Sequence, residues 1–232
     1  MPRVGRVISI ALITAGTVVL LDVGLTLAYR EPLSAIYGSI RQDQAADELA
    51  ELEARYPRPA DLRATASLRD ARRKAAILAG RFAHRVEDGE AIGRLLAPAM
   101  DGLDSVVVEG TDSGALQKGP GHYPQTGLPG EPGTVAIAGH RTTYLAPFRH
   151  VDAVERGDRI TLEMPYATLT YAVERTAVVE PEDVGVIRDV GYQRLVLTAC
   201  HPLYSAAERY VVFARLRGVR IELPPRAGQP VG

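Results

Sequence analysis

The sequence predicts an all-β domain, either closed into a barrel or packed as a sandwich, with helical segments before it. Seven or eight short β-rich runs fall between residues 91 and 216, and Gly, Pro and Asp separate them. Few long helical patterns interrupt this region. The length of 232 residues suits one such domain with appendages.

Each expected strand is a short apolar or alternating run. LTYAV at 169–173, for example, alternates in the manner of a half-buried strand. The expected strands cover residues 91–97, 105–110, 133–140, 158–164, 167–180, 192–200 and 209–216. Residues 111–133 form a long Gly/Pro-rich connection, and long ordered loops in compact domains are often functional.

The first 28 residues predict a membrane anchor. Residues 7–28 are apolar with one exception, and as a helix they would extend about 33 Å, enough to cross a bilayer. Arg3 and Arg6 precede the run and favour a cytoplasmic N-terminus, with the bulk of the chain outside the cytoplasm. A cleavable signal peptide is the alternative, although its apolar region is normally shorter, about 7–15 residues.

Four segments follow from these patterns: an anchor (1–29), a helical spacer (30–88), a β domain (89–222) and a C-terminal tail (223–232). The spacer is rich in Ala, Leu, Arg and Glu, and PRP at 57–59 divides it into two helical stretches. We interpret its basic cluster, RDARRK, as a solvated helix face, with contact to an anionic envelope polymer as the alternative.

Composition and motifs exclude several function classes. The formal net charge of −1 gives no sign of nucleic-acid binding. The sequence contains no GxxxxGK[ST], GxGxxG or HExxH pattern, so phosphate-loop, dinucleotide and simple zinc-protease functions have no support. We expect neither a cofactor nor a metal.

Cys200 is the only cysteine of the chain. A single thiol outside the cytoplasm indicates intermolecular pairing or a reactive group, and a buried structural cysteine is the equally weighted alternative. Cys200 ends the run LVLTAC, and Arg209 begins the next expected strand. If these strands pair antiparallel, the two side chains face each other, and the arginine can bind a carbonyl oxygen or an oxyanion.

A cysteine nucleophile also needs a group that handles protons. His84 lies in the spacer, His122 in the Gly/Pro loop, and His150 after an expected short helix. His201 adjoins the cysteine, but its side chain should point away from that of Cys200. His140 is favoured because, like Cys200, it stands at the C-terminal end of an expected strand, after a glycine that gives room.

The segments containing AGHR and LTACHP, with the arginine nine positions after the cysteine, resemble the sortase family, most of all its class E, housekeeping-type members of actinobacteria. The resemblance covers about residues 90–220 and implies a closed eight-stranded β-barrel. It implies His140, Cys200 and Arg209 as catalytic residues. The family usually has a threonine where this chain has Ala199, which puts substrate positioning in doubt.

The resemblance also implies a reaction. Sortases cut a sorting signal of LPxTG or LAxTG type between Thr and Gly through a cysteine thioester, which a cell-wall amine then resolves. The implied partners are surface proteins with such a signal, a lipid-linked peptidoglycan precursor and the membrane. We expect Tyr123 and Thr198 to line the substrate groove. The alternatives are a cysteine peptidase that hydrolyses the same bond and a barrel that binds envelope peptides without turnover.

Overall fold

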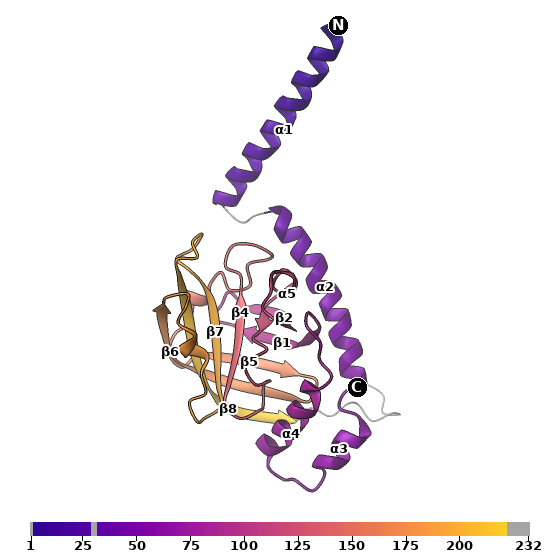
Figure 1. Cartoon of the computed structure of the whole chain (residues 1–232), viewed down its shortest axis with the longest axis vertical. Coiled ribbons are helices and arrows are strands. Elements are labelled where there is room, and N and C mark those ends of the chain that lie inside the picture. Colours follow the sequence, from indigo (N-terminus) through magenta and orange to yellow (C-terminus); the bar gives the residue numbers. More distant parts are fainter. Residues whose placement is uncertain (1, 29–31, 222–232) are drawn as a thin grey trace.

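The computed structural model describes residues 2–28 and 32–221, in which eight strands close into a barrel (Figure 1). The strands are β1 (Ala91–Ala97), β2 (Leu103–Glu109), β3 (Gly121–His122), β4 (Thr134–Gly139), β5 (Arg159–Met164), β6 (Ala167–Val179), β7 (Arg194–His201) and β8 (Glu208–Ile221). Their order is β1-β2-β3-β4-β7-β8-β6-β5, and β5 pairs with β1. The closed eight-stranded barrel is confirmed, and the sandwich alternative is wrong.

Two neighbouring pairs in the barrel are parallel, namely β2 with β3 and β4 with β7, whereas the others are antiparallel. Because β4 and β7 run in the same direction, their C-terminal ends lie at the same end of the barrel. The residue that follows β4 and the last residues of β7 are therefore brought together.

Strand β7 is apolar on both faces because both faces are covered. Leu195, Leu197 and Ala199 belong to a buried cluster to which strands from all around the barrel contribute, so they point inward. Val196 instead packs with Phe213 in a separate cluster on the outer face. This two-sided burial explains why β7 reads as an almost continuous apolar run.

Helices α2 (Pro32–Arg55) and α4 (Ala71–Ala83) pack against the barrel, and α3 (Pro59–Thr65) packs against α4. Leu78 and Phe82 of α4 are fully buried in the same cluster as the inward-facing strand residues. Leu49 of α2 is buried in a second cluster with residues of β2. The region expected as a spacer thus shares its core with the barrel, while the domain boundaries stay a prediction.

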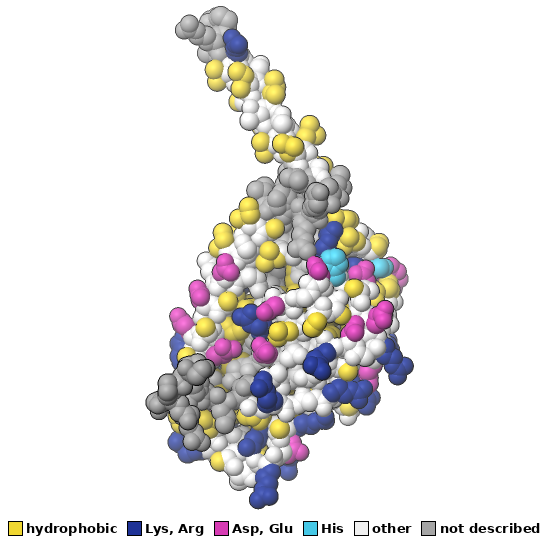
Figure 2. All heavy atoms as spheres, turned by 180° about the vertical axis from the view of Figure 1, so that it is seen from behind, with side chains coloured by type: hydrophobic (Ala, Val, Ile, Leu, Met, Phe, Trp, Pro, Cys, Tyr) yellow, Lys and Arg dark blue, Asp and Glu magenta, His cyan; other side chains and the backbone are white. Residues whose placement is uncertain are grey.

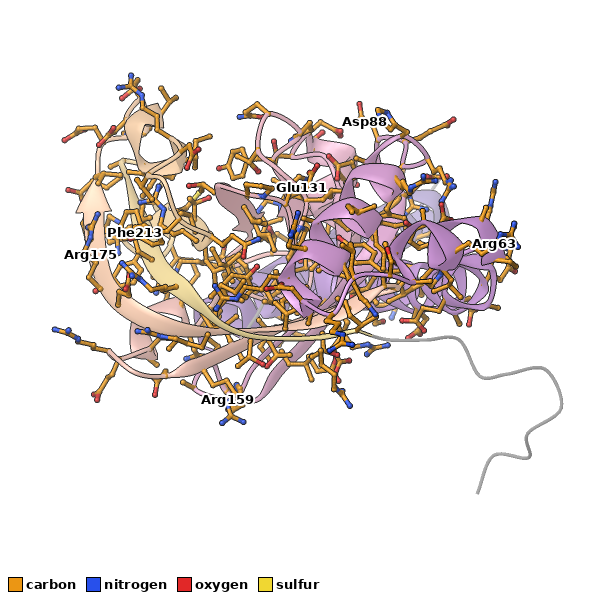
Figure 3. The ribbon with its side chains drawn as sticks, turned by 90° about the horizontal axis from the view of Figure 1, so that it is seen from below. Arg63, Asp88, Glu131, Arg159, Arg175 and Phe213 are labelled. Atoms are coloured by element: carbon orange, nitrogen blue, oxygen red, sulfur yellow. The ribbon has the colours of Figure 1, made fainter. Side chains whose placement is uncertain are left out.

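Figure 3 shows the helices and Arg63 on the opposite side of the barrel from Arg175 and Phe213.

The second expected helical stretch is divided into α3 and α4, because Asp70 caps the start of α4 by accepting a hydrogen bond from the Arg73 backbone N–H at 2.9 Å.

The Gly/Pro-rich connection at 111–133 is only partly irregular. It contains the short helix α5 (Ser113–Lys118) and the strand β3. The Asp112 side chain caps α5 by accepting hydrogen bonds from the backbone N–H groups of Gly114 and Ala115. The composition of residues 111–133 does not reveal this helix, because the aspartate that caps it and its glycines are also typical of turns.

The helix expected over residues 7–28 is present as α1 (Pro2–Ala28). Figure 2 shows apolar side chains along its surface, and Ile13 and Leu20 are about 69% and 73% exposed. Among residues 2–28 and 32–221, no helix combines the length and apolar character needed to cross a membrane, which corrects the expectation of a membrane-spanning segment. The expected tail at 223–232 lies outside the described residues.

Candidate active site

Cys200 and Arg209 are paired residues on adjacent antiparallel strands. The β7–β8 ladder places Cys200 directly opposite Arg209, as the sequence predicted, and Thr198 opposite Val211. Side chains alternate along a strand, so Cys200 shares the outer face with Thr198, while Ala199 points into the core. The thiol is free and partly exposed at the end of the barrel wall.

The same alternation bears on Ala199, where the family usually has threonine. Its side chain is 3% exposed and packs inside the barrel. A threonine hydroxyl on this backbone would therefore point into the core and away from the outer groove. The departure from the family pattern removes no group from the substrate side of β7.

His140 follows the last residue of β4. Gly139 is in register with Ala199 in the parallel β4–β7 pair, so His140 stands level with Cys200 on the neighbouring strand. A side chain at Gly139 would meet the Phe148 ring at 2.5 Å, so only glycine lets that ring pack against the strand end. The Phe148 backbone N–H in turn donates to the His140 carbonyl oxygen at 2.9 Å.

Burial lowers the pKa of His140 below its ordinary value of 6.5, because desolvation disfavours the imidazolium form. The ring lies 5.5 Å, centroid to centroid, from that of Tyr144. Burial therefore favours the neutral imidazole of His140 in the folded chain.

Arg141, which the sequence analysis missed, connects the two strand ends. Its guanidinium is 3% exposed and donates to the Cys200 carbonyl oxygen at 3.5 Å, to His201 Nδ1 at 3.3 Å and to Asp152 Oδ2 at 2.6 Å. Since Arg141 only donates, His201 Nδ1 must carry a lone pair here. The arginine of the AGHR motif is the sequence feature that could have identified this residue. The His201 side chain is directed away from the thiol, as expected.

The Arg209 guanidinium is positioned by the chain just before β8. Its Nη1 donates to the carbonyl oxygens of Ala206 at 2.9 Å and Glu208 at 3.0 Å. These contacts use one nitrogen of the guanidinium, and Arg209 also lines a small pocket together with Thr198. The two hydrogen bonds fix the position of the guanidinium relative to the backbone.

Tyr123 and Thr198 meet at the floor of a small pocket beside Arg209. The two hydroxyl oxygens lie 2.9 Å apart. The pocket has a volume of about 110 Å³, and Val186 and Ile187 of the short 3-10 helix η2 (Val184–Ile187) form part of its wall. Both hydroxyl side chains therefore line one pocket, and their role in substrate binding stays a prediction. A larger groove of about 400 Å³ along α2 includes none of these residues.

His122 supports the segment that carries Tyr123. It is 1% exposed, and its Nδ1 lies 2.9 Å from the Glu109 carboxylate. Its Nε2 lies 3.0 Å from the Gly127 carbonyl oxygen and 3.1 Å from Thr126 Oγ1. The Thr126 hydroxyl also donates to the Tyr123 carbonyl oxygen at 2.9 Å. His122 is thus a buried structural histidine, in agreement with its rejection as the proton-handling group.

Comparisons with known proteins agree with this fold. Residues 95–217 match the family described as "Sortase domain". Sortase D of Bacillus subtilis (strain 168) is 34% identical over 133 residues, which cover 56% of this chain and 65% of the relative. Sortase SrtE2 of Streptomyces coelicolor (strain ATCC BAA-471 / A3(2) / M145) is 35% identical over 140 residues, 54% of this chain and 55% of the relative. The chain thus spans just over half to slightly under two thirds of these relatives.

A solved structure agrees with the assignment. Sortase E from Streptomyces avermitilis superposes with a TM-score of 0.54 at 31% identity, covering 62% of this chain and 97% of that one. The family match over residues 95–217 contains His140, Cys200 and Arg209 and most of the barrel strands. The chain therefore belongs to the sortase family.

Proposed function

We propose that this protein is a cysteine transpeptidase that joins a protein bearing a C-terminal sorting signal to an amine of the cell wall. One observation carries the proposal: Cys200 and Arg209 are opposed on β7 and β8, and His140 stands level with them at the end of β4. Family membership supports the same reaction class.

The first half of the reaction forms a thioester. Neutral His140 accepts the proton of the Cys200 thiol, and the resulting thiolate attacks the threonine carbonyl carbon of the signal. Arg209 donates hydrogen bonds to the oxyanion that forms. The C–N bond then breaks as the tetrahedral intermediate collapses, and imidazolium His140 protonates the departing glycine amine. The neutral imidazole is left beside the acyl-enzyme.

The second half restores the enzyme. An acceptor amine attacks the thioester carbonyl, and neutral His140 removes its proton. Collapse of the second tetrahedral intermediate forms the new amide and releases the Cys200 thiolate, which takes the proton back from His140. Burial favours the neutral imidazole, which is the form that this half-reaction needs.

The substrate is proposed to be a signal of LPxTG or LAxTG type, lying along the outer face of β7. Tyr123 and Thr198 line a pocket next to Arg209, where a small side chain of an extended peptide can be held. The proposed acceptor is the amine of a lipid-linked peptidoglycan precursor. Neither assignment needs a cofactor or a metal.

The enzyme is proposed to act at the cell envelope with its barrel on the extracytoplasmic side. Support comes from α1, whose large apolar side chains are mostly exposed. We propose that α1 associates with the membrane and holds the barrel near membrane-bound substrates, which raises their effective concentration. Fractionation of cells that express the chain with and without residues 1–28 tests this, since the shortened form should leave the membrane fraction.

The reaction is tested with the full chain and fluorescent LPATG and LAATG peptides, each with and without triglycine. Transpeptidation predicts a ligated product whose yield rises with triglycine, and no product from Cys200→Ala. A peptidase would release only the free acid at an undiminished rate. A binding protein without turnover would retain the peptide and form neither product.

A further inference from the structure

The loop after His140 has an unusual backbone. Tyr144, Leu145 and Ala146 all have positive φ angles, at 49°, 65° and 46°. Residues with a side chain rarely adopt this left-handed conformation, and three in succession persist only where neighbouring structure holds them. The question is what holds this loop.

Helix α2 holds this loop in place. The Tyr144 backbone N–H donates to Ser34 Oγ at 3.3 Å, and the Tyr144 ring lies edge-on to Tyr37 with centroids 6.2 Å apart. Gly38 is buried at the crossing, where a Cβ atom would lie only 2.9 Å from the Tyr144 carbonyl carbon. The helix and the loop can approach this closely only because position 38 is glycine.

Tyr144, the residue that α2 holds in place, contacts His140 directly. The Tyr144 ring packs against the imidazole with centroids 5.5 Å apart and planes inclined by 40°. On its other side, the loop is fixed by the hydrogen bond from the Phe148 backbone N–H to the His140 carbonyl oxygen. Contact therefore runs without a gap from the start of α2, through Tyr144, to the imidazole.

We infer that Tyr144 is a positioning residue for His140 and that the N-terminal part of α2, residues 34–38, is the element that sets it. The catalytic part of this inference rests on the proposed function. The contact from α2 through Tyr144 to His140 rests on geometry alone. The helix next to α1 thereby belongs to the support of the active site, in addition to connecting α1 with the barrel.

The matched test compares Gly38→Ala with Gly80→Ala in the full chain. Both glycines are helical, but a Cβ at Gly80 meets only the flexible Glu131 side chain at 3.5 Å. We expect Gly38→Ala to lower kcat about tenfold to a hundredfold with KM little changed, because a small displacement of a catalytic group is costly. Gly80→Ala should keep the kcat of the unaltered enzyme. Tyr144→Ala should behave like Gly38→Ala, and Tyr144→Phe should recover most of the rate because it keeps the ring.

A second readout does not depend on turnover. Diethyl pyrocarbonate modifies accessible neutral imidazoles, and peptide mass spectrometry resolves each site. We expect Gly38→Ala and Tyr144→Ala to raise the modification rate of His140 several-fold relative to the exposed His84 in the same molecule. If both variants keep the rate ratio and the kcat of the unaltered chain, the positioning role is wrong. If the unaltered chain turns over no peptide but the His140 rate still rises, the proposed function fails and the contact stands.

Discussion

Cys200 and Arg209 occupy directly opposed positions in the antiparallel ladder of β7 and β8, so thiol and guanidinium project from the same face of the barrel wall. The parallel pairing of β4 with β7 brings His140 to the same level from the other side. The three groups thus come from three neighbouring strands of one closed sheet. A rigid barrel wall is well suited to hold such an arrangement, because each strand is fixed by two partners.

Replacement of Arg209 by lysine should impair peptide cleavage severely. Lysine keeps the positive charge but cannot reproduce the planar fork that contacts both the loop carbonyls and an oxyanion. We expect kcat to fall by roughly 10²–10³, as for loss of an oxyanion donor. Arg217→Lys, an exposed position on the same strand, is the control and should be neutral in the same steady-state assay. Near-full activity of Arg209→Lys would refute the assigned role.

Replacement of Arg141 by methionine should destabilise the protein. The change leaves the Cys200 carbonyl oxygen and His201 Nδ1 without their donor in a poorly hydrated place. An unsatisfied buried polar group costs about 1–3 kcal/mol, so the free energy of unfolding in urea should fall by that amount. A variant with unchanged stability would show that Arg141 does not connect the strand ends.

The pKa of His140 should lie below 6.5 in the folded chain, because burial disfavours the imidazolium. The unfolded chain then binds a proton at this site at higher pH than the folded chain does. The contribution of His140 to stability is therefore unchanged above the unfolded pKa and falls as pH drops from about 6.5 through the folded value. An NMR titration of the ring protons gives the midpoint, and His140→Gln should reduce the loss of stability over this range. A midpoint at or above 6.5 would contradict the account.

Replacement of Phe82 by alanine should destabilise the barrel itself. The ring is fully buried between α4 and the core and packs against Tyr56 and Tyr166 with centroids 5.0 and 5.5 Å away. Loss of such a ring typically costs about 3–5 kcal/mol. Ile77→Ala, at a 40% exposed position of the same helix, should cost far less. If urea unfolding gives similar values for both, α4 is a separable appendage.

The expected strands were predictable because alternation and apolar runs are local properties. Strand β3 was missed because it has two residues and is held mainly by pairing with β2 and β4, which are distant in sequence. The docking of α2 and α4 was missed for a related reason: Leu49, Leu78 and Phe82 reveal an apolar stripe but not its partner.

In the candidate site, too, local features were predictable from the sequence and contacts between distant segments were not. The opposition of Cys200 and Arg209 followed from a short connection between consecutive strands, which favours antiparallel pairing. The position of His140 depends on the parallel pairing of β4 with β7. These strands are neighbours in the barrel but are separated in the sequence by β5 and β6, so no local sequence pattern encodes their pairing. Arg141 and Tyr144 gained their roles only from contacts with distant segments.

The most direct measurement is a mass-spectrometric search for the acyl-enzyme. The full chain is incubated with a sorting peptide in the absence of an acceptor amine, quenched in acid and digested. The account predicts an adduct on Cys200 with the mass of the peptide up to and including its threonine, which disappears on addition of triglycine. Peptide cleavage without any adduct on Cys200, or continued cleavage by Cys200→Ala, would contradict it.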